Sequence, residues 1–341
     1  MSASSTRPGP APCAPRTPGA HASASDAPGT PSTPDTPAPA ATRAAPGPPA
    51  APRTPGGHAP SPAPAPDTPG APSYHRLTGL TPVLSVRCAP PPPGRGWLRA
   101  ADLAARPEAV RELIAHDARR GLARYGQPLR PDVAAGFGLH RFVWPVSLLF
   151  TLPWFLERRV PLLALADVAL RRRPEAVELA VRPAEFACLP DDPAAGSPRT
   201  RTVPDEAALA AELRCALGGF LAPVLAAFRP EARRGPRVLW AMATDAVVEG
   251  LCYAGGLLGE PERARAELSA LLAPADPAHA PGADGGPAAA PAPFTPGAGF
   301  APPAPGHGEA SRTDRLRASC CLVYTAEPRE MCGGCPRVTR C

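Results

Sequence analysis

Apolar residues between positions 97 and 272 recur mainly every three or four residues, which is the spacing of one face of an α-helix. The first such stretch begins at Pro107, a residue that suits the first turn of a helix, and ends before Gly126, which suits a C-terminal cap. Arginines and glutamates occupy the opposite face. The pattern predicts an amphipathic helix whose charged face meets solvent.

A second helix is predicted from Pro131 to about Leu156. It is apolar nearly all round, so we expect it at the centre of the core, kinked or split at Pro145 and Pro153. Its most apolar stretch, residues 142–156, is shorter than the roughly 20 residues that cross a bilayer. The sequence therefore predicts no transmembrane span, with peripheral membrane contact as the alternative.

Three further helices are predicted: one that begins at Pro204, one over residues 237–258 and one over residues 261–272. The alternation within residues 177–189 predicts a small antiparallel β hairpin, and residues 83–86 are β-prone. The expected fold class is mainly α (α+β), a helical body with a small hairpin. Several glycines would let a neighbour approach the fourth helix closely, namely Gly250, Gly255, Gly256 and Gly259.

Composition divides the chain into four parts. The 54 prolines and 31 glycines concentrate in two tracts that have few large apolar side chains. Such tracts cannot bury enough surface to offset chain entropy. We therefore predict a disordered tail at 1–73, a helical body at 74–272, a Pro/Ala/Gly-rich linker at 273–311 and a C-terminal segment at 312–341.

The charge of the chain and its N-terminal sequence limit the expected binding partners and cellular location. The formal net charge is +6, all basic residues are arginine, and no basic run is interleaved with aromatic residues, so no nucleic-acid partner is expected. The first 30 residues contain no apolar run typical of a secretory signal. We expect a cytoplasmic protein, in which thiols stay reduced.

The C-terminal segment carries four of the ten cysteines in the pattern C-C-x10-C-x2-C: Cys320, Cys321, Cys332 and Cys335. Four thiolates this close suit zinc or an iron–sulfur cluster. Cys332-Gly-Gly-Cys335 forms a hook, whereas the adjacent pair cannot wrap one ion but can reach a two-iron cluster. This asymmetry favours iron–sulfur, and the alternatives are a structural zinc, disulfides or unpaired thiols.

This motif, with a glycine before its last cysteine and Pro336 after it, resembles that of the FhuF-like ferric siderophore reductases. The resemblance implies that Cys320, Cys321, Cys332 and Cys335 hold a [2Fe-2S] cluster. It also implies an oxidoreductase that passes one electron to Fe(III) in a siderophore, so that weakly held Fe(II) leaves during iron acquisition. The partners would be a ferric siderophore and an electron donor that the sequence does not identify.

The helical body resembles the same family more weakly, over about residues 97–270. The resemblance lies in residues 139–145, 220–225 and 238–245, and the Leu-Trp dipeptide at 239–240 is its best marker. It gives no substrate-binding residues for the body. From their place just before Cys320, we predict that Arg315 and Arg317 steer an anionic substrate.

Two other functions fit the sequence: a zinc-stabilised interaction protein without redox activity, and an iron–sulfur sensor or carrier that serves another acceptor. No metalloprotease, P-loop or serine-hydrolase motif is present, so no catalytic residue beyond the cluster is predicted. Asp245 and Glu249 are four residues apart and are interpreted as a surface pair, His140 as a core residue and Cys341 as a spare thiol.

Replacing Cys332 by serine should abolish the visible absorption of the cluster, because serine is a poor ligand for iron in this setting. Cys13→Ser is the matched control, since Cys13 lies in the predicted tail, and should leave the spectrum unchanged. Absorption spectra of the anaerobically purified variants test this. A cluster that survives in Cys332→Ser would refute the ligand set.

Overall fold

The structure is a computed structural model, and it describes residues 70–94, 96–273, 294, 298–300, 315–328 and 335–337. Residues 1–69 of the predicted tail and most of the predicted linker, 273–311, lie outside the described residues. The four-part division of the chain therefore stays a prediction.

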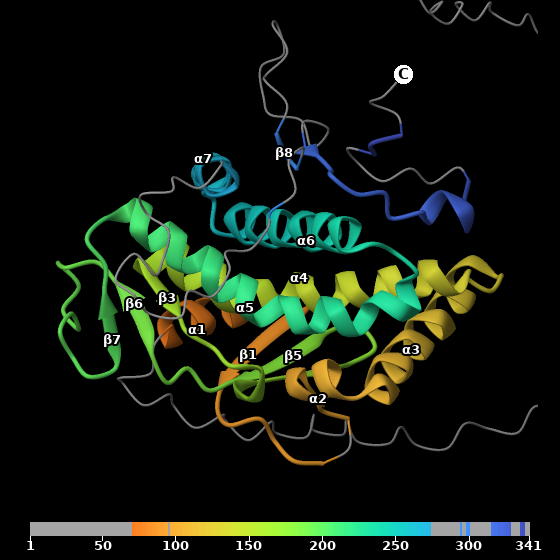
Figure 1. Cartoon of the computed structure of the whole chain (residues 1–341), viewed down its shortest axis with the longest axis horizontal. Helices are drawn as coiled ribbons and strands as arrows, with labels where there is room; N and C mark the ends of the chain where they lie inside the picture. Colours follow the sequence, from red (N-terminus) through yellow and green to blue (C-terminus); the bar gives the residue numbers. More distant parts are fainter. Residues whose placement is uncertain are drawn as a thin grey trace, which may run out of the picture. The chain divides into compact units, whose positions relative to one another are not determined.

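The described chain is mainly α with small mixed sheets, as the sequence predicted (Figure 1). All five predicted helices are present, and two short ones precede them. The short helix α1 was missed because only two large apolar side chains, Tyr74 and Leu77, mark its buried face. The helices are α1 (Ala71–Leu80), α2 (Ala100–Ala105), α3 (Pro107–Tyr125), α4 (Pro131–Glu157), α5 (Glu206–Ala232), α6 (Pro236–Leu257) and α7 (Pro261–Leu272).

Local sequence explains where these helices begin and end. Gly126 caps α3 in the left-handed conformation, with φ of 68°, and its N–H donates to the carbonyl of Leu122. Asp205 caps α5, because its carboxylate accepts the N–H of Ala208 at 2.8 Å. Both caps satisfy backbone groups that the end of a helix leaves without a partner.

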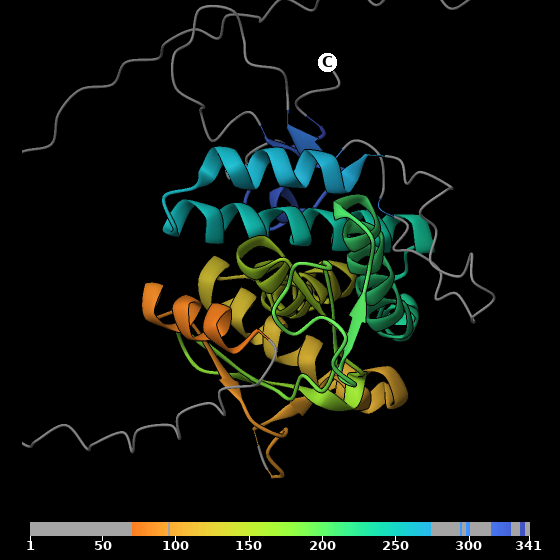
Figure 2. The ribbon, with the colours of Figure 1, turned by 90° about the vertical axis from the view of Figure 1, so that its left-hand side faces the viewer.

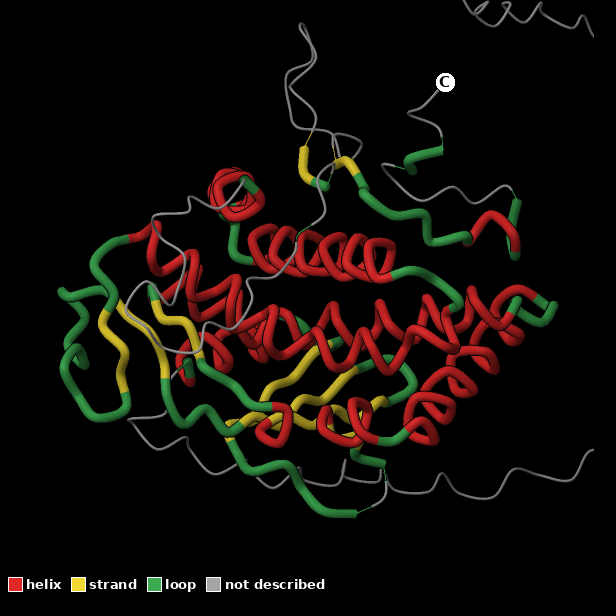
Figure 3. The backbone as a smooth tube through the Cα atoms, viewed as in Figure 1, coloured by secondary structure: helices red, strands yellow, loops and turns green. Residues whose placement is uncertain are grey.

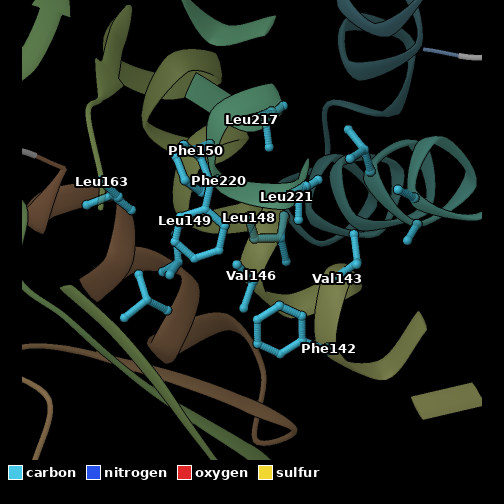
Figure 4. Close-up of a cluster of buried hydrophobic side chains, with 14 of the residues drawn as sticks. Phe142, Val143, Val146, Leu148, Leu149, Phe150, Leu163, Leu217, Phe220 and Leu221 are labelled. Carbon is cyan, nitrogen blue, oxygen red and sulfur yellow. The ribbon is translucent and has the colours of Figure 1, made fainter. Parts of the chain in front are cut away.

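Helix α4 lies at the centre of the core and packs against α1, α3, α5 and α6. Pro145 and Pro153 both lie inside it, yet the helix is continuous, so they do not split it, and the predicted kink stays a prediction. The free energy gained by packing this helix on all sides exceeds the cost of the backbone hydrogen bonds that the two prolines remove. Figure 4 shows α4 side chains interleaved with α5, where the rings of Phe150 and Phe220 meet edge to face at 5.3 Å.

Within the described residues, the strands form three small sheets (Figure 3). The first has the order β1-β5-β4-β2 and the second β3-β6-β7, while β8 pairs with β9 in the C-terminal part of the chain. Their bounds are β1 (Leu84–Cys88), β2 (Leu98–Arg99), β3 (Arg159–Pro161), β4 (Val168–Arg172), β5 (Val177–Val181), β6 (Phe186–Cys188), β7 (Thr200–Thr202), β8 (Gly299–Phe300) and β9 (Arg315–Leu316).

The hairpin predicted at residues 177–189 is wrong, because its two halves belong to different sheets. Strand β5 pairs on one side with β1, in parallel, and on the other with β4, antiparallel. With both edges occupied, β5 cannot pair with β6. Strand β6 lies instead between β3 and β7.

Helices α4 and α5 are each 27 residues long and apolar enough to cross a membrane by length and composition. The prediction of no span relied on the shorter stretch 142–156, and α4 is longer than that. Most of each helix is nevertheless buried inside the protein, as in the core helices of soluble proteins. Two such helices are weak evidence for a membrane protein.

Glycines bring α6 close to its neighbours, as the sequence predicted. A Cβ at Gly250 would lie 3.2 Å from the carbonyl oxygen of Trp144 in α4, and one at Gly255 would overlap the Cβ of Ala264 in α7. Helices α6 and α7 lie side by side (Figure 2). Gly256 and Gly259, by contrast, have open space around them, so the prediction is wrong for these two.

We expect Gly255→Ala to lower the free energy of unfolding by about 1–3 kcal/mol, because the added methyl group forces α7 away from α6. Gly256→Ala makes the same chemical change in the same helix and should raise stability by about 0.5–1 kcal/mol. Urea unfolding of both variants measures the difference. Equal effects would show that close approach at Gly255 is not required.

Candidate functional site

The C-terminal segment is docked on the outer side of α6, where it appears in blue in Figure 1. The carboxylate of Asp245 accepts the N–H of Ala318 at 2.8 Å, the N–H of Ser319 at 2.9 Å and the hydroxyl of Ser319 at 2.5 Å. Asp245 is only 2% exposed, and Ser319 is buried too. The residue directly before Cys320 is therefore fixed to the helical body.

The interpretation of Asp245 and Glu249 as a surface pair is wrong. Carboxylates four residues apart on a helix usually face solvent, but Asp245 is buried under the C-terminal segment. A signal was available in the sequence. Asp245 interrupts a run of residues, Leu239 to Leu251, that is otherwise largely apolar, and a charged residue on the buried face of a helix needs a partner.

Arg315 and Arg317 both face these carboxylates of α6. Arg315 Nη2 lies 3.0 Å from Glu249 Oε2, and Arg317 lies 3.6 Å from Glu249 and 3.8 Å from Asp245. Their side chains are 20% and 11% exposed. Ion pairs thus add to the attachment of the segment. That the two arginines steer a substrate stays a prediction.

The electrostatics of this cluster depend on burial and on the arginines. Burial raises the pKa of Asp245, although its hydrogen bonds to Ser319 and Ala318 act in the opposite direction. For Glu249, burial also acts to raise the pKa, but His140 and the two arginines together lower it below its usual value. Burial lowers the pKa of His140, so its imidazole is neutral at pH 7 where it faces Glu249 at 3.7 Å.

A second attachment lies beyond the cysteine pair. Gln127, in the connection between α3 and α4, donates from its side-chain amide to the carbonyl oxygen of Ala326 at 2.5 Å. Ala326 is buried in a small apolar cluster with Leu129 and Val133, against which Leu322 also packs. The adjacent cysteines thus lie between two fixed points, one on α6 and one at the start of α4.

The structure describes three of the four predicted ligands. Cys320 and Cys321 are half-buried, Cys335 is 5% exposed, and Cys332 lies outside the described residues. Among the residues described, no group of three or more His, Cys, Asp or Glu side chains is arranged to hold a metal ion. The chemistry of the donor set, four closely spaced thiols, nevertheless fits an iron–sulfur cluster. The assignment of ligands stays a prediction.

A cavity of about 420 Å³ adjoins Cys321. The C-terminal segment contributes one wall, while α3, α4 and α6 contribute the others. Aromatic and apolar side chains cover part of the lining, and charged or polar groups cover the rest. The lining residues used below are Tyr125, Phe137, His140, Met242, Arg317 and Cys321. His140, interpreted from sequence as a core residue, is therefore a cavity residue.

We expect Asp245→Asn to loosen the C-terminal segment, since the amide cannot accept all three hydrogen bonds and carries no charge. Losing about 2 kcal/mol of charged hydrogen bonding would speed local amide exchange by about 30-fold. Hydrogen exchange of residues 315–326, followed by mass spectrometry, measures it. Asp191→Asn, on an exposed loop, is the matched control. Unchanged exchange in Asp245→Asn would contradict a docking role for Asp245.

Comparison with known proteins found a match in the C-terminal segment. A family model described as the FhuF 2Fe-2S C-terminal domain matches residues 317–337, which contain all four cysteines of the motif. No curated protein and no solved structure matches the chain. The resemblance of the helical body lies outside the matched residues and stays a prediction. The match supports an FhuF-like family for this chain and indicates that it carries a [2Fe-2S] cluster.

Proposed function

We propose that this protein is a ferric siderophore reductase that passes one electron to Fe(III) in a siderophore and so releases Fe(II). The observation that carries the proposal is the four-cysteine segment, which matches the FhuF 2Fe-2S domain. Cys320, Cys321, Cys332 and Cys335 would hold the cluster, which supplies one electron at a time when bound.

The docked segment supports this function because electron transfer requires the acceptor to come close to the cluster. Asp245 and Gln127 hold the chain on both sides of the cysteine pair, so that the pair keeps a defined position against the helices. Cys321 lines the adjoining cavity. Part of a ferric chelate that enters this cavity would lie next to a cluster ligand.

The cavity lining suits a chelate with both apolar and polar parts. Phe137, Tyr125 and Met242 offer apolar surface that excludes water, and Arg317 offers a positive charge. Steering of an anionic chelate by Arg315 and Arg317 is part of the proposal, although Glu249 offsets some of their charge. No side chain is required to act as a general acid or nucleophile, because the reaction moves one electron.

The proposed setting is the cytoplasm, where reduced thiols are free to bind iron. The second partner is a one-electron donor, either a protein or a reduced cofactor. Peripheral contact with a membrane is compatible with this setting. No nucleic-acid partner is proposed, because the modest positive charge of the chain is not concentrated with aromatic residues.

The test begins with full-length protein purified without oxygen. Absorption and EPR spectra before and after dithionite should show a cluster that is paramagnetic only when reduced, with about two iron and two sulfide per chain. Reduced protein, freed of dithionite, is then mixed with a ferric tris-hydroxamate in the presence of an Fe(II)-trapping dye. We expect one Fe(II) per reduced chain and return of the oxidised spectrum.

Two results would overturn the proposal in different ways. A colourless protein with one zinc per chain would support a structural zinc segment. A normal cluster that is not oxidised by ferric chelates would support a sensor or a carrier for another acceptor.

Cys252→Ser, which removes a half-buried cysteine outside the motif, is the control and should retain both the cluster and the reduction of the ferric chelate.

A further inference from the structure

A second cavity, of about 240 Å³, shares His140 with the cavity that Cys321 adjoins and is strongly basic. His140 lines both cavities. Four arginines from three different elements surround the second one: Arg120 from α3, Arg141 from α4, and Arg172 and Arg173 from β4 and the turn after it. The proposed reductase function uses none of these arginines.

The wall of this cavity contains a buried charge cluster. Asp117 has no exposed surface and pairs with both Arg141 and Arg172. Arg172 Nη1 donates to Asp117 Oδ2 at 2.5 Å, and the side chain of Arg172 is only 9% exposed. One carboxylate thus faces two guanidinium groups, so the cluster keeps a net positive charge.

Two nitrogen atoms of Arg172 lack partners. Its Nε and Nη2 are buried and form no hydrogen bond with any described residue. Leaving a charged N–H donor buried and unpaired is costly, so such donors usually have a partner in the functional state. Burial lowers the pKa of Arg172, and Arg141 and Arg120 act in the same direction. An anion in the cavity would stabilise the charged form of this guanidinium.

The other arginines leave positive charge unmatched. Arg173 pairs with Glu178 at 2.9 Å, but Glu178 also pairs with Arg171. Arg120 is exposed and forms no ion pair with a described residue. The charge around the cavity is thus suited to an anion with more than one negative group.

The rest of the lining is apolar and indicates an organic ligand. Trp144, Pro145 and Val177 line the same cavity. An inorganic anion such as phosphate would leave this surface in contact with water, whereas a carbon skeleton would cover it. Guanidinium groups bind carboxylates through two parallel hydrogen bonds. Arg120, which is exposed, and Arg141, whose side chain is 35% exposed, are accessible for such contacts.

We propose that this cavity binds a small organic anion that carries two or more carboxylate groups. Arg120 and Arg141 hold the carboxylates, the buried guanidinium of Arg172 adds positive charge behind them, and Trp144 covers the carbon skeleton. The site goes beyond the proposed reductase activity and does not depend on it, because its residues are separate from the cysteine segment. Because His140 lines both cavities, the bound anion would lie near the space that Cys321 adjoins.

Isothermal titration calorimetry of the full-length protein at low salt tests the proposal. The probe is propane-1,2,3-tricarboxylate, which lacks the hydroxyl group with which citrate chelates iron. We expect saturable binding at one site per chain, and binding of inorganic phosphate that is about tenfold weaker or more. Arg172→Gln should weaken tricarboxylate binding by about tenfold, because it removes a buried positive charge beside the anion.

Arg172→Gln also removes a partner of buried Asp117 and could fail to fold, so a second variant is needed. Arg120→Gln leaves the Asp117 cluster intact and should weaken binding by about two- to fivefold, the effect of losing one exposed charge. Arg229→Gln is the matched control, because Arg229 is exposed and lines a different arginine-rich hollow. It should bind the tricarboxylate as the unchanged protein does.

Three results would overturn the proposal. The first is no binding of the tricarboxylate by the unchanged protein at millimolar concentration. The second is phosphate binding as tight as tricarboxylate binding, which would indicate a simple inorganic-anion site. The third is an equal loss in Arg120→Gln and Arg229→Gln, which would indicate general attraction to positive charge.

Discussion

The attachment of the C-terminal segment depends on one buried carboxylate. Asp245 lies on the face of α6 that the segment covers, and its two oxygens accept two backbone N–H groups and one hydroxyl from Ala318 and Ser319. A buried carboxylate without partners would be costly, and so would two buried amides without acceptors. The Asp245 carboxylate and the two buried N–H groups therefore each require the other as a hydrogen-bond partner. This mutual requirement sets the position of the cysteine pair, which begins one residue later.

Helix α4 connects this attachment to the rest of the protein. It packs against α6, which carries Asp245, and against α3 and α5, and its one histidine lines two cavities. One cavity has the C-terminal segment and Cys321 as a wall, and the other is lined by four arginines. A single apolar helix at the centre of the core thus fixes the separation between the proposed electron-transfer site and the proposed anion site.

Sequence patterns succeeded where the signal was local. Helix α3 begins at a proline and ends at a capping glycine, and helix α7 has the predicted bounds, because each residue's preference and the apolar period agree. They failed where pairing was not local. Residues 177–189 alternate like a hairpin, but β5 already has β1 and β4 as neighbours, and β1 is almost a hundred residues away in sequence.

The sequence by itself was enough to indicate the iron–sulfur chemistry of the C-terminal segment. The number, spacing and type of the cysteines at 320, 321, 332 and 335 depend only on the order of residues, and they indicated the cluster that the family match also indicates. Only the tertiary structure decided what surrounds that segment. Whether Asp245 faces solvent or a backbone amide, and whether Arg172 is paired or has spare donors, depends on contacts between residues far apart in the chain. Periodicity in one helix carries no information about such contacts.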